Sequence, residues 1–164
     1  MEVAGATRRW RLQFRYRGSR RKSAVAQLFS LGHICAPVTY MISTTSEAQP
    51  FQVQFSDGKH SALADTTQGK GGGESGFRPH ELLEAALATC MNMTATMYAA
   101  KHAIPLTQVV TKVTLDRSGS DQVIFSYSVE LSGELTVQQK EAILSSMRIC
   151  PVRKTLLRGA RFVD

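Results

Sequence analysis

A chain of 164 residues, 43% of them hydrophobic, has the size and composition of one globular domain. Its three cysteines are too few for a disulfide framework and indicate a reducing setting, for which we expect the cytoplasm. The net charge of +7 arises in residues 1–40, with eight Lys/Arg and one acid, whereas residues 41–164 hold twelve of each sign and lack the basic surface of a nucleic-acid-binding body.

Residues 1–40 differ from the rest in being rich in arginine and poor in acids. This composition leaves open an organellar targeting segment, an arm for nucleic acid or a membrane surface, or an extension upstream of a true start at Met41. The basic region is too long for a secretory signal, and the apolar run is too interrupted for a transmembrane segment. We predict a basic, disordered extension over residues 1–40, in which Cys35 has no role, and a folded domain over residues 41–164.

The N-terminal part of the domain has the pattern of a β-hairpin. Apolar and polar residues alternate over 51–55, Asp57-Gly58 favours a tight turn, and residues 60–65 supply a returning strand. The glycine-rich residues 68–76 lack the Gly-x-x-x-x-Gly-Lys-Ser/Thr order of a phosphate-binding loop. We therefore predict a flexible connection there.

The longest periodic apolar segment predicts a helix over residues 77–101. Pro79 suits its first turn, and Glu81 suits the positive end of its dipole. Helical spacing defines one apolar stripe, which we expect to be buried: Leu83, Ala86, Leu87, Cys90, Met93, Thr94 and Met97. Cys90 is thus expected to point into whatever this helix packs against.

The C-terminal part predicts a second hairpin and a second helix. Strands over 109–116 and 123–131 alternate in polarity around turn residues 117–121. A capping box, Thr136 with Gln139, starts a helix whose predicted apolar stripe is Ile143, Leu144, Met147 and Cys150. The order of elements predicts one α+β domain with two core helices packed on antiparallel sheets.

The end of the chain carries further signals. Pro151 is expected to stop or kink the second helix, and residues 155–159 to form a short turn. Phe162-Val163 could add a last edge strand. If a turn starts at Pro151 with Cys150 at its N-cap, backbone N–H groups and the nearby Arg153 would lower the pKa of Cys150.

The two cysteines on the predicted helix stripes suggest redox chemistry. A thiolate that attacks a peroxide becomes a sulfenic acid, and a second thiol nearby converts it into a disulfide, which a thiol or dithiol reductant reopens. This chemistry requires the sulfurs of Cys90 and Cys150 to meet when the helices pack. The alternative is that each cysteine only fills space, since free cysteine is among the most buried residue types.

Two segments resemble motifs of the OsmC/Ohr superfamily, in particular its OsmC-like branch. Residues 79–90, PHELLEAALATC, resemble the family helix in which a Pro stands eleven residues before the reactive Cys, and residues 150–156, CPVRKTL, resemble its Cys-Pro motif. The resemblance covers residues 51–164 and implies an intertwined α+β homodimer with active sites at the subunit interface. It also implies a thiol peroxidase acting on organic hydroperoxides in oxidative-stress defence, with Cys90 peroxidatic and Cys150 resolving.

One departure from the family pattern concerns activation of the thiol. Well-studied members hold the reactive thiolate with an Arg from the N-terminal β region, which a Glu just after the helix Pro orients. Here residues 42–77 contain no Arg, and His80 follows Pro79, with Glu81 next. His80 lies about 15 Å from Cys90 along a straight helix, so a bridging cation is required. Four cations from either subunit are candidates: Arg78, Arg153, Lys59 and Lys70.

Three functions therefore remain open. The paired cysteines favour a peroxidase that works as a homodimer with an organic hydroperoxide and a thiol or dithiol reductant, and without a metal or other cofactor. The absence of the family's Arg favours a non-catalytic OsmC-like dimer that binds a small apolar ligand at its interface. The third places the function in the basic arm, and the neutral charge of the body argues against it.

Overall fold

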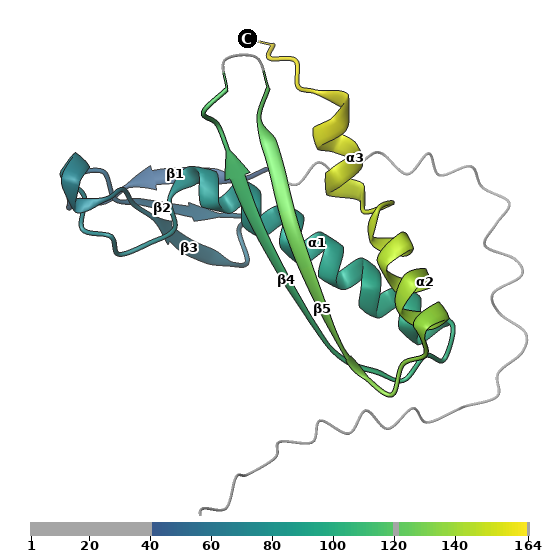
Figure 1. The fold of residues 1–164 in the computed structure, drawn as a ribbon. Coiled ribbons are helices and arrows are strands. Elements are labelled where there is room, and N and C mark those ends of the chain that lie inside the picture. The colour runs from purple at the N-terminus through teal and green to yellow at the C-terminus, as the bar shows by residue number, and fades with distance from the viewer. Residues whose placement is uncertain (1–40, 120–121, 164) are drawn as a thin grey trace, which may run out of the picture. The chain divides into compact units, whose positions relative to one another are not determined.

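The computed structural model describes residues 41–119 and 122–163 (Figure 1). Their elements are β1 (Ser43–Ser46), β2 (Val53–Ser56), β3 (Ser61–Ala64), the 3-10 turn η1 (Gln68–Lys70), α1 (Pro79–Lys101), β4 (Leu106–Asp116), β5 (Ile124–Gly133), α2 (Val137–Met147) and α3 (Pro151–Arg158). The predicted α+β class with antiparallel sheets is confirmed. The predicted extension over residues 1–40, Cys35 included, lies outside the described residues. None of the described helices is both long and apolar enough to cross a membrane.

The N-terminal sheet has the strand order β1-β2-β3 and is antiparallel throughout. The predicted hairpin is present: β2 pairs with β3 in the register Val53↔Ala64. In its turn, Asp57 Oδ1 accepts the N–H groups of Lys59 at 2.8 Å and His60 at 2.7 Å. Sequence reasoning missed β1, because its four residues are all polar and exposed and so give no alternating apolar signal.

The glycine-rich residues 68–76 are tied down by a buried carboxylate, contrary to the predicted flexible connection. Asp65 accepts the N–H groups of Thr66, Gly73 and Ser75 at 2.7, 3.2 and 3.0 Å. It also accepts the Ser75 hydroxyl at 2.7 Å. The hydrogen bonds from Ser75 are the main reason that the pKa of Asp65 is lowered to about 2. The loop is therefore positioned by an ionised acceptor that local sequence patterns do not reveal.

Acid titration tests this carboxylate. Because the pKa of Asp65 is about 2 in the fold and about 3.9 in an unfolded chain, its contribution is full above about pH 4 and is lost as the pH falls towards 2. We expect Asp65→Asn to be less stable than wild type at neutral pH. We also expect the free energy of unfolding of wild type to fall more steeply below about pH 4. Urea unfolding at several pH values measures how the free energy of unfolding depends on pH in wild type and in Asp65→Asn. An equal pH dependence in the two proteins would contradict this role of Asp65.

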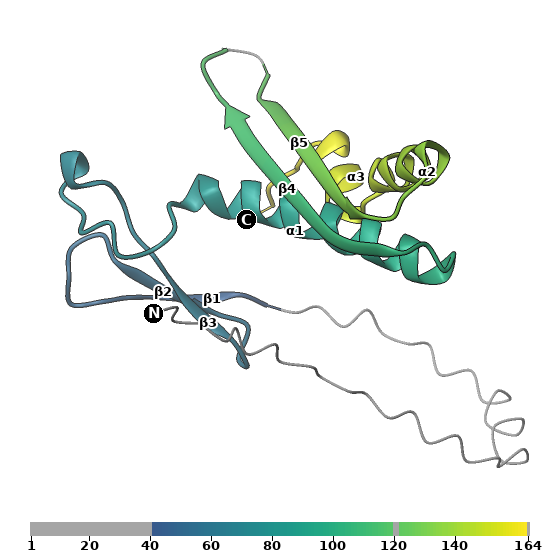
Figure 2. The ribbon, with the colours of Figure 1, turned by 60° about the horizontal axis from the view of Figure 1, so that its bottom comes forward.

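Helix α1 lies along the β4–β5 hairpin, as Figures 1 and 2 show. The hairpin is the predicted one, with β4 and β5 antiparallel along their length. Two side chains of α1 bond to the backbone of β4. Glu84 Oε1 accepts the N–H of Leu115 at 2.6 Å, and Asn92 Nδ2 donates to the carbonyl of Val109 at 2.8 Å. These bonds fix the position of the helix along the strand.

The buried face of α1 differs from the predicted one. Its buried side chains recur every four residues: Leu87, Met91, Ala95 and Ala99. Of the predicted stripe, only Leu87 is buried, and Cys90 and Thr94 are half-buried. Four other predicted members are exposed: Leu83, Ala86, Met93 and Met97. The buried face includes two small alanines, Ala95 and Ala99, which let neighbouring elements approach the helix closely. Close packing against those elements therefore selects the buried face more than the hydrophobicity of the side chains does.

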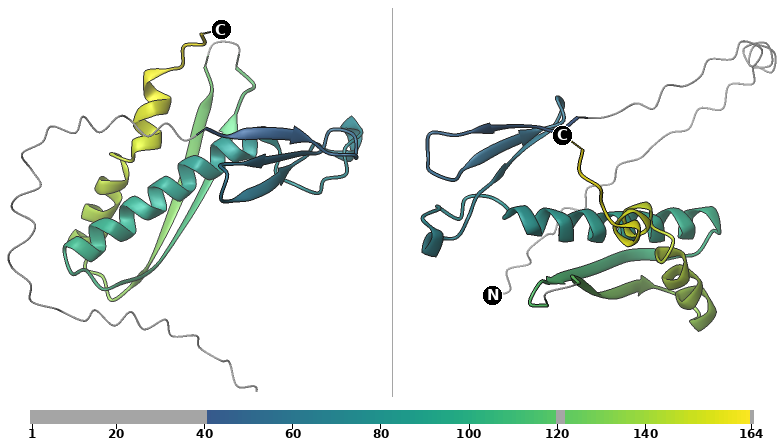
Figure 3. Two further views of the ribbon diagram at one scale, coloured as in Figure 1. Left: turned by 180° about the vertical axis from the view of Figure 1, so that it is seen from behind. Right: turned by 90° about the horizontal axis from the view of Figure 1, so that it is seen from above.

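Two helices, rather than one, follow the hairpin (Figure 3). The predicted capping box starts α2: Gln139 N–H donates to Thr136 Oγ1 at 3.2 Å, and Thr136 N–H donates to Gln139 Oε1 at 2.9 Å. Helix α2 ends at Met147, and Pro151 begins α3, which includes most of the predicted short turn. Residues 162–163 are not in a strand, so the predicted edge strand is wrong.

The end of β5 depends on a glycine. Gly133 pairs with Leu106, has a φ of 137°, and leaves no room for a Cβ beside the carbonyl oxygen of Pro105. We expect Gly133→Ala to lower the free energy of unfolding by about 2–4 kcal/mol. Gly58→Ala is the matched control, since Gly58 has a φ of 89° but open space around its Cβ position. Equal losses in denaturant unfolding would show that φ alone, and not contact with Pro105, sets the cost.

Candidate functional site

The structure brings the two predicted cysteines together. The Sγ atoms of Cys90 and Cys150 lie 2.6 Å apart, with no disulfide bond between them. A disulfide bond is about 2.05 Å long, so a small movement separates this pair from a bond. Cys90 is half-buried in the middle of α1, whereas Cys150 is fully buried at 0% exposed. The pair thus joins two segments that are sixty residues apart in sequence.

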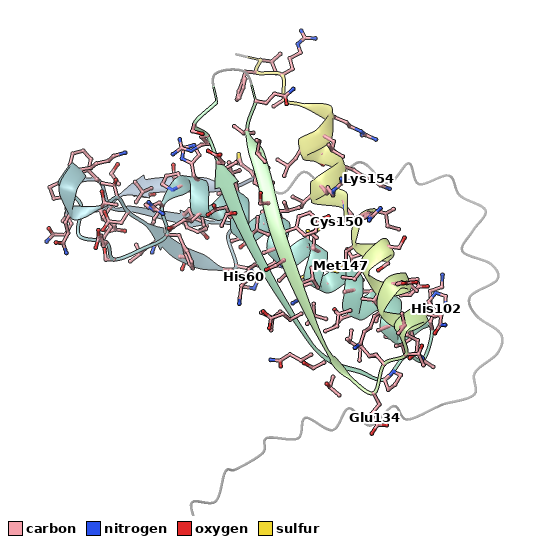
Figure 4. All side chains as sticks on the ribbon, in the orientation of Figure 1. His60, His102, Glu134, Met147, Cys150 and Lys154 are labelled. Atoms are coloured by element: carbon pink, nitrogen blue, oxygen red, sulfur yellow. The ribbon has the colours of Figure 1, made fainter. Side chains whose placement is uncertain are left out.

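Cys150 is positioned by the break between α2 and α3, next to Met147 (Figure 4). It is the N-cap of α3, and its Sγ accepts the N–H of Arg153 at 3.5 Å. Its own N–H donates to the carbonyl of Met147 at 3.2 Å. The predicted turn at Pro151 is therefore correct. The predicted place of Cys150 on the stripe of the second helix is wrong, because that helix ends three residues earlier.

The predicted lowering of the Cys150 pKa is also wrong. Burial raises the pKa of this thiol, and its hydrogen bond to Cys90 acts in the same direction. The backbone N–H groups of Arg153 and, more weakly, Val152 oppose this rise in pKa, but the bond from Arg153 is long, at 3.5 Å. Loss of solvation of the thiolate outweighs their effect. The geometry therefore favours Cys90, which solvent can reach, as the first thiol to react.

Of the four candidate residues, Arg153 contacts the thiol pair, and it does so through its backbone N–H and not through its charged group. Besides its backbone bond to Cys150, its guanidinium donates to the carbonyl of Arg148 at 3.3 Å. The guanidinium thus braces the turn that presents Cys150. Lys59 lies in the β2–β3 turn and Lys70 in η1, and neither has a contact with a cysteine among the described hydrogen bonds.

Arg78 and Glu81 cap the start of α1. Arg78 Nε and Nη2 lie 2.8 and 2.6 Å from Glu81 Oε1, and the Arg78 N–H donates to Glu81 Oε2 at 2.9 Å. The side-chain hydrogen bonds between them raise the pKa of Arg78 and lower that of Glu81. His80 Nε2 lies 3.2 Å from Nη1 of Arg117, a neighbour that sequence reasoning missed. Along the chain, Arg78, His80 and Glu81 are about three helical turns before Cys90.

A separate apolar pocket of about 690 Å³ lies between the N-terminal sheet and the start of α1. Its apolar lining includes Ile42, Phe51, Val53, Phe55, Pro79 and Leu82. Its volume is within the range of small-molecule sites. The alternation of apolar and polar residues around β2 predicted an apolar face on this strand. The sequence did not predict that Ile42 and Leu82 would join it in one pocket, because that depends on where β1 and α1 lie.

Comparisons with known proteins agree with this fold. The family model described as OsmC-like protein matches residues 71–163, and no curated protein matches the chain. An OsmC-like protein from Mycoplasma pneumoniae is 21% identical, with a TM-score of 0.63 over 76% of this chain and 91% of that chain.

Two further solved structures are similar. The organic hydroperoxide resistance protein OsmC from Legionella pneumophila is 20% identical, with a TM-score of 0.55 over 76% of this chain and 92% of that one. The organic hydroperoxide resistance protein OhrB of Bacillus subtilis is 18% identical, with a TM-score of 0.55 over 76% of this chain and 93% of that one. At these identities the likeness concerns the fold. Because the family model matches more than half of the chain, this chain belongs to the OsmC-like protein family.

Proposed function

We propose that this chain is a thiol-dependent peroxidase that reduces organic hydroperoxides and serves in oxidative-stress defence. The observation that carries the proposal is the 2.6 Å separation of the sulfurs of Cys90 and Cys150. The printed names of the similar proteins from Legionella pneumophila and Bacillus subtilis, organic hydroperoxide resistance proteins, support the substrate class.

In the proposed cycle Cys90 reacts first. Its thiolate attacks an oxygen of the hydroperoxide, the O–O bond breaks, and an S–O bond forms, while the alkoxide leaves as an alcohol after taking a proton. Cys150 then loses its proton and attacks the sulfur of the sulfenic acid, which forms the disulfide and releases water. An external thiol or dithiol supplies two electrons and two protons and restores both thiols.

The surrounding residues have positioning roles in this proposal. Arg153 holds Cys150 through its N–H and braces the turn with its guanidinium. Arg78 and Glu81 hold the first turn of α1 and so set the direction of the helix that carries Cys90. A cation close to Cys90 itself could also come from a second subunit.

We propose that the working form is a homodimer of the intertwined kind, with its active sites at the interface. Leu83, Ala86, Met93 and Met97 form an exposed apolar row on α1, here called the α1 stripe. Met93 and Met97 are 62% and 73% exposed. Exposed apolar rows of this kind mark interaction surfaces. By its helical spacing Cys90 lies within the α1 stripe, so a partner that covers the stripe would also shield the thiol from water.

The proposed cycle needs a supply of reduced thiols, which suits the cytoplasm or another reducing compartment.

We further propose that residues 41–164 form the working domain and that residues 1–40 are an extension to it, either a targeting segment or a stretch upstream of a start at Met41. Intact mass spectrometry of the native protein tests the extension. A product that begins at Met41 would remove residues 1–40 from any account of function.

Loss of free thiols tests the peroxidase. Reduced protein is mixed with cumene hydroperoxide, and thiols are counted over time. We expect wild type and the control variant Cys35→Ser each to lose two thiols per chain, with a Cys90–Cys150 disulfide found by peptide mass spectrometry. Cys90→Ser should react far more slowly. Thiols that persist in wild type, or a Cys90→Ser variant that reacts as fast, would sink the proposal.

A second candidate function is binding of a small apolar ligand by a non-catalytic dimer. The apolar pocket of about 690 Å³ favours it. Native mass spectrometry of purified protein would detect a ligand that co-purifies. A pocket that is always empty, in a protein whose thiols react with hydroperoxide, would count against this candidate.

A further inference from the structure

We propose that a slot beside the thiol pair binds small apolar carboxylates. This α3 slot has a volume of about 260 Å³ and is lined mainly by Leu87, Val123, Phe125, Tyr127, Arg153 and Leu156. In this lining Arg153 is the charged residue, among apolar and aromatic residues from α1, α3, β5 and the segment just before β5. The volume is slightly below the usual range for drug-sized ligands, so the slot suits a short chain.

The shape of the slot favours a molecule with an apolar end. Of the lining residues, Leu87 is 2% exposed, whereas Val123 is 58% exposed. Leu87 is one helical turn before Cys90, and Arg153 is bonded through its N–H to Cys150. A ligand whose chain covers Leu87 and Phe125 would therefore lie next to the residues that hold the thiols.

The charge of the slot favours an anion. The guanidinium of Arg153 bonds to a neutral carbonyl, that of Arg148. In the part of the chain that the structure describes, no carboxylate forms an ion pair with Arg153. Moreover, residues 142–163 contain five Lys/Arg and no acid. The body has no net charge, but its positive charges are unevenly placed, and five of them lie in the segment that contains Cys150 and α3.

These two properties together select the ligand class. A guanidinium binds a carboxylate with charge-assisted hydrogen bonds, and these are stronger where apolar walls reduce contact with water. The walls in turn gain from covering a hydrocarbon chain. A neutral apolar molecule would use the walls and leave the guanidinium without an anion, and a small inorganic anion would use only the guanidinium. A short-chain carboxylate satisfies both.

Calorimetric titration of the reduced full chain with octanoate and with octan-1-ol tests the proposal. We expect octanoate to bind at least about tenfold more tightly than octan-1-ol, because only octanoate can pair with the guanidinium. Arg153→Gln should remove most of that preference. Arg158→Gln is the matched control, since it removes the same charge from α3 at a residue outside the lining of the slot. It should leave octanoate binding within about twofold of wild type.

A third variant tests whether binding needs the apolar slot as well as the charge of Arg153. Val123→Trp should fill the slot while keeping Arg153, and octanoate binding should then be lost with an unchanged circular dichroism spectrum. Equal binding of octanoate and octan-1-ol, equal losses in Arg153→Gln and Arg158→Gln, or no binding at all would overturn the proposal. Binding does not require the thiols to react, so Cys90→Ser should bind octanoate as wild type does. Failure of the peroxidase therefore remains distinguishable from failure of the slot.

Discussion

Cys150→Ser is expected to react once with an organic hydroperoxide and then to stop at the sulfenic acid. In wild type the Cys150 sulfur lies 2.6 Å from that of Cys90, which makes the second step intramolecular. A well-placed internal nucleophile corresponds to a very high effective concentration, so its removal should slow consumption of the sulfenic acid by at least about 100-fold. Trapping with dimedone and peptide mass spectrometry would locate the adduct on Cys90 and follow its decay.

This test distinguishes the role of Cys90 from that of Cys150. The reaction is run without added reductant, since a small dithiol can reduce a sulfenic acid directly. Cys35→Ser serves as the control and should form the Cys90–Cys150 disulfide with no lasting adduct. A Cys150→Ser variant in which Cys90 stays unlabelled would contradict the assignment of Cys90 as the first thiol. Rapid decay of the adduct would contradict Cys150 as the resolving one.

Met97→Glu is expected to convert the proposed homodimer into a monomer. Met97 belongs to the α1 stripe and is 73% exposed in the single chain. If a partner covers it, a glutamate there leaves an unpaired carboxylate in an apolar interface, which costs several kcal/mol. The dissociation constant should then rise by about 100-fold or more. Sedimentation equilibrium over a range of protein concentrations measures this change.

Gln138→Glu is the control for Met97→Glu, since it adds the same charge to an exposed position in the first turn of α2. It should leave the association state unchanged. A wild-type protein that is monomeric at all concentrations would show that the α1 stripe has another role. An equal effect of the two variants would show that net charge, and not the α1 stripe, controls association.

Local signals predicted most of the secondary structure, because each of those elements depends on interactions between residues close in sequence. Pro79 at the first turn of α1, the capping box of Thr136 and Gln139, and the turn at Asp57 all act over two to four residues. A helix cap or tight turn needs little from the rest of the fold. These elements are where they were predicted, and β1, which lacks apolar residues, was the one strand missed.

Predictions that required knowledge of neighbouring elements did less well. The buried face of α1 was misplaced, because Met91, Ala95 and Ala99 are selected by what packs on them. The role of Asp65 was not foreseen, because its donors lie up to ten residues away in a glycine-rich loop. The pKa of Cys150 was predicted in the wrong direction, because its burial depends on the core that surrounds it.

The sequence by itself determined the α+β class, the family motifs and the two cysteines as candidates, because periodicity, caps and motif spacing are local properties. Only the tertiary structure decided that the sulfurs of Cys90 and Cys150 lie 2.6 Å apart and that the backbone N–H of Arg153 bonds to the sulfur of Cys150. Both depend on the packing of α1 against α2 and α3. A contact between residues sixty positions apart follows from how the elements fill a common core, and no local pattern encodes that arrangement.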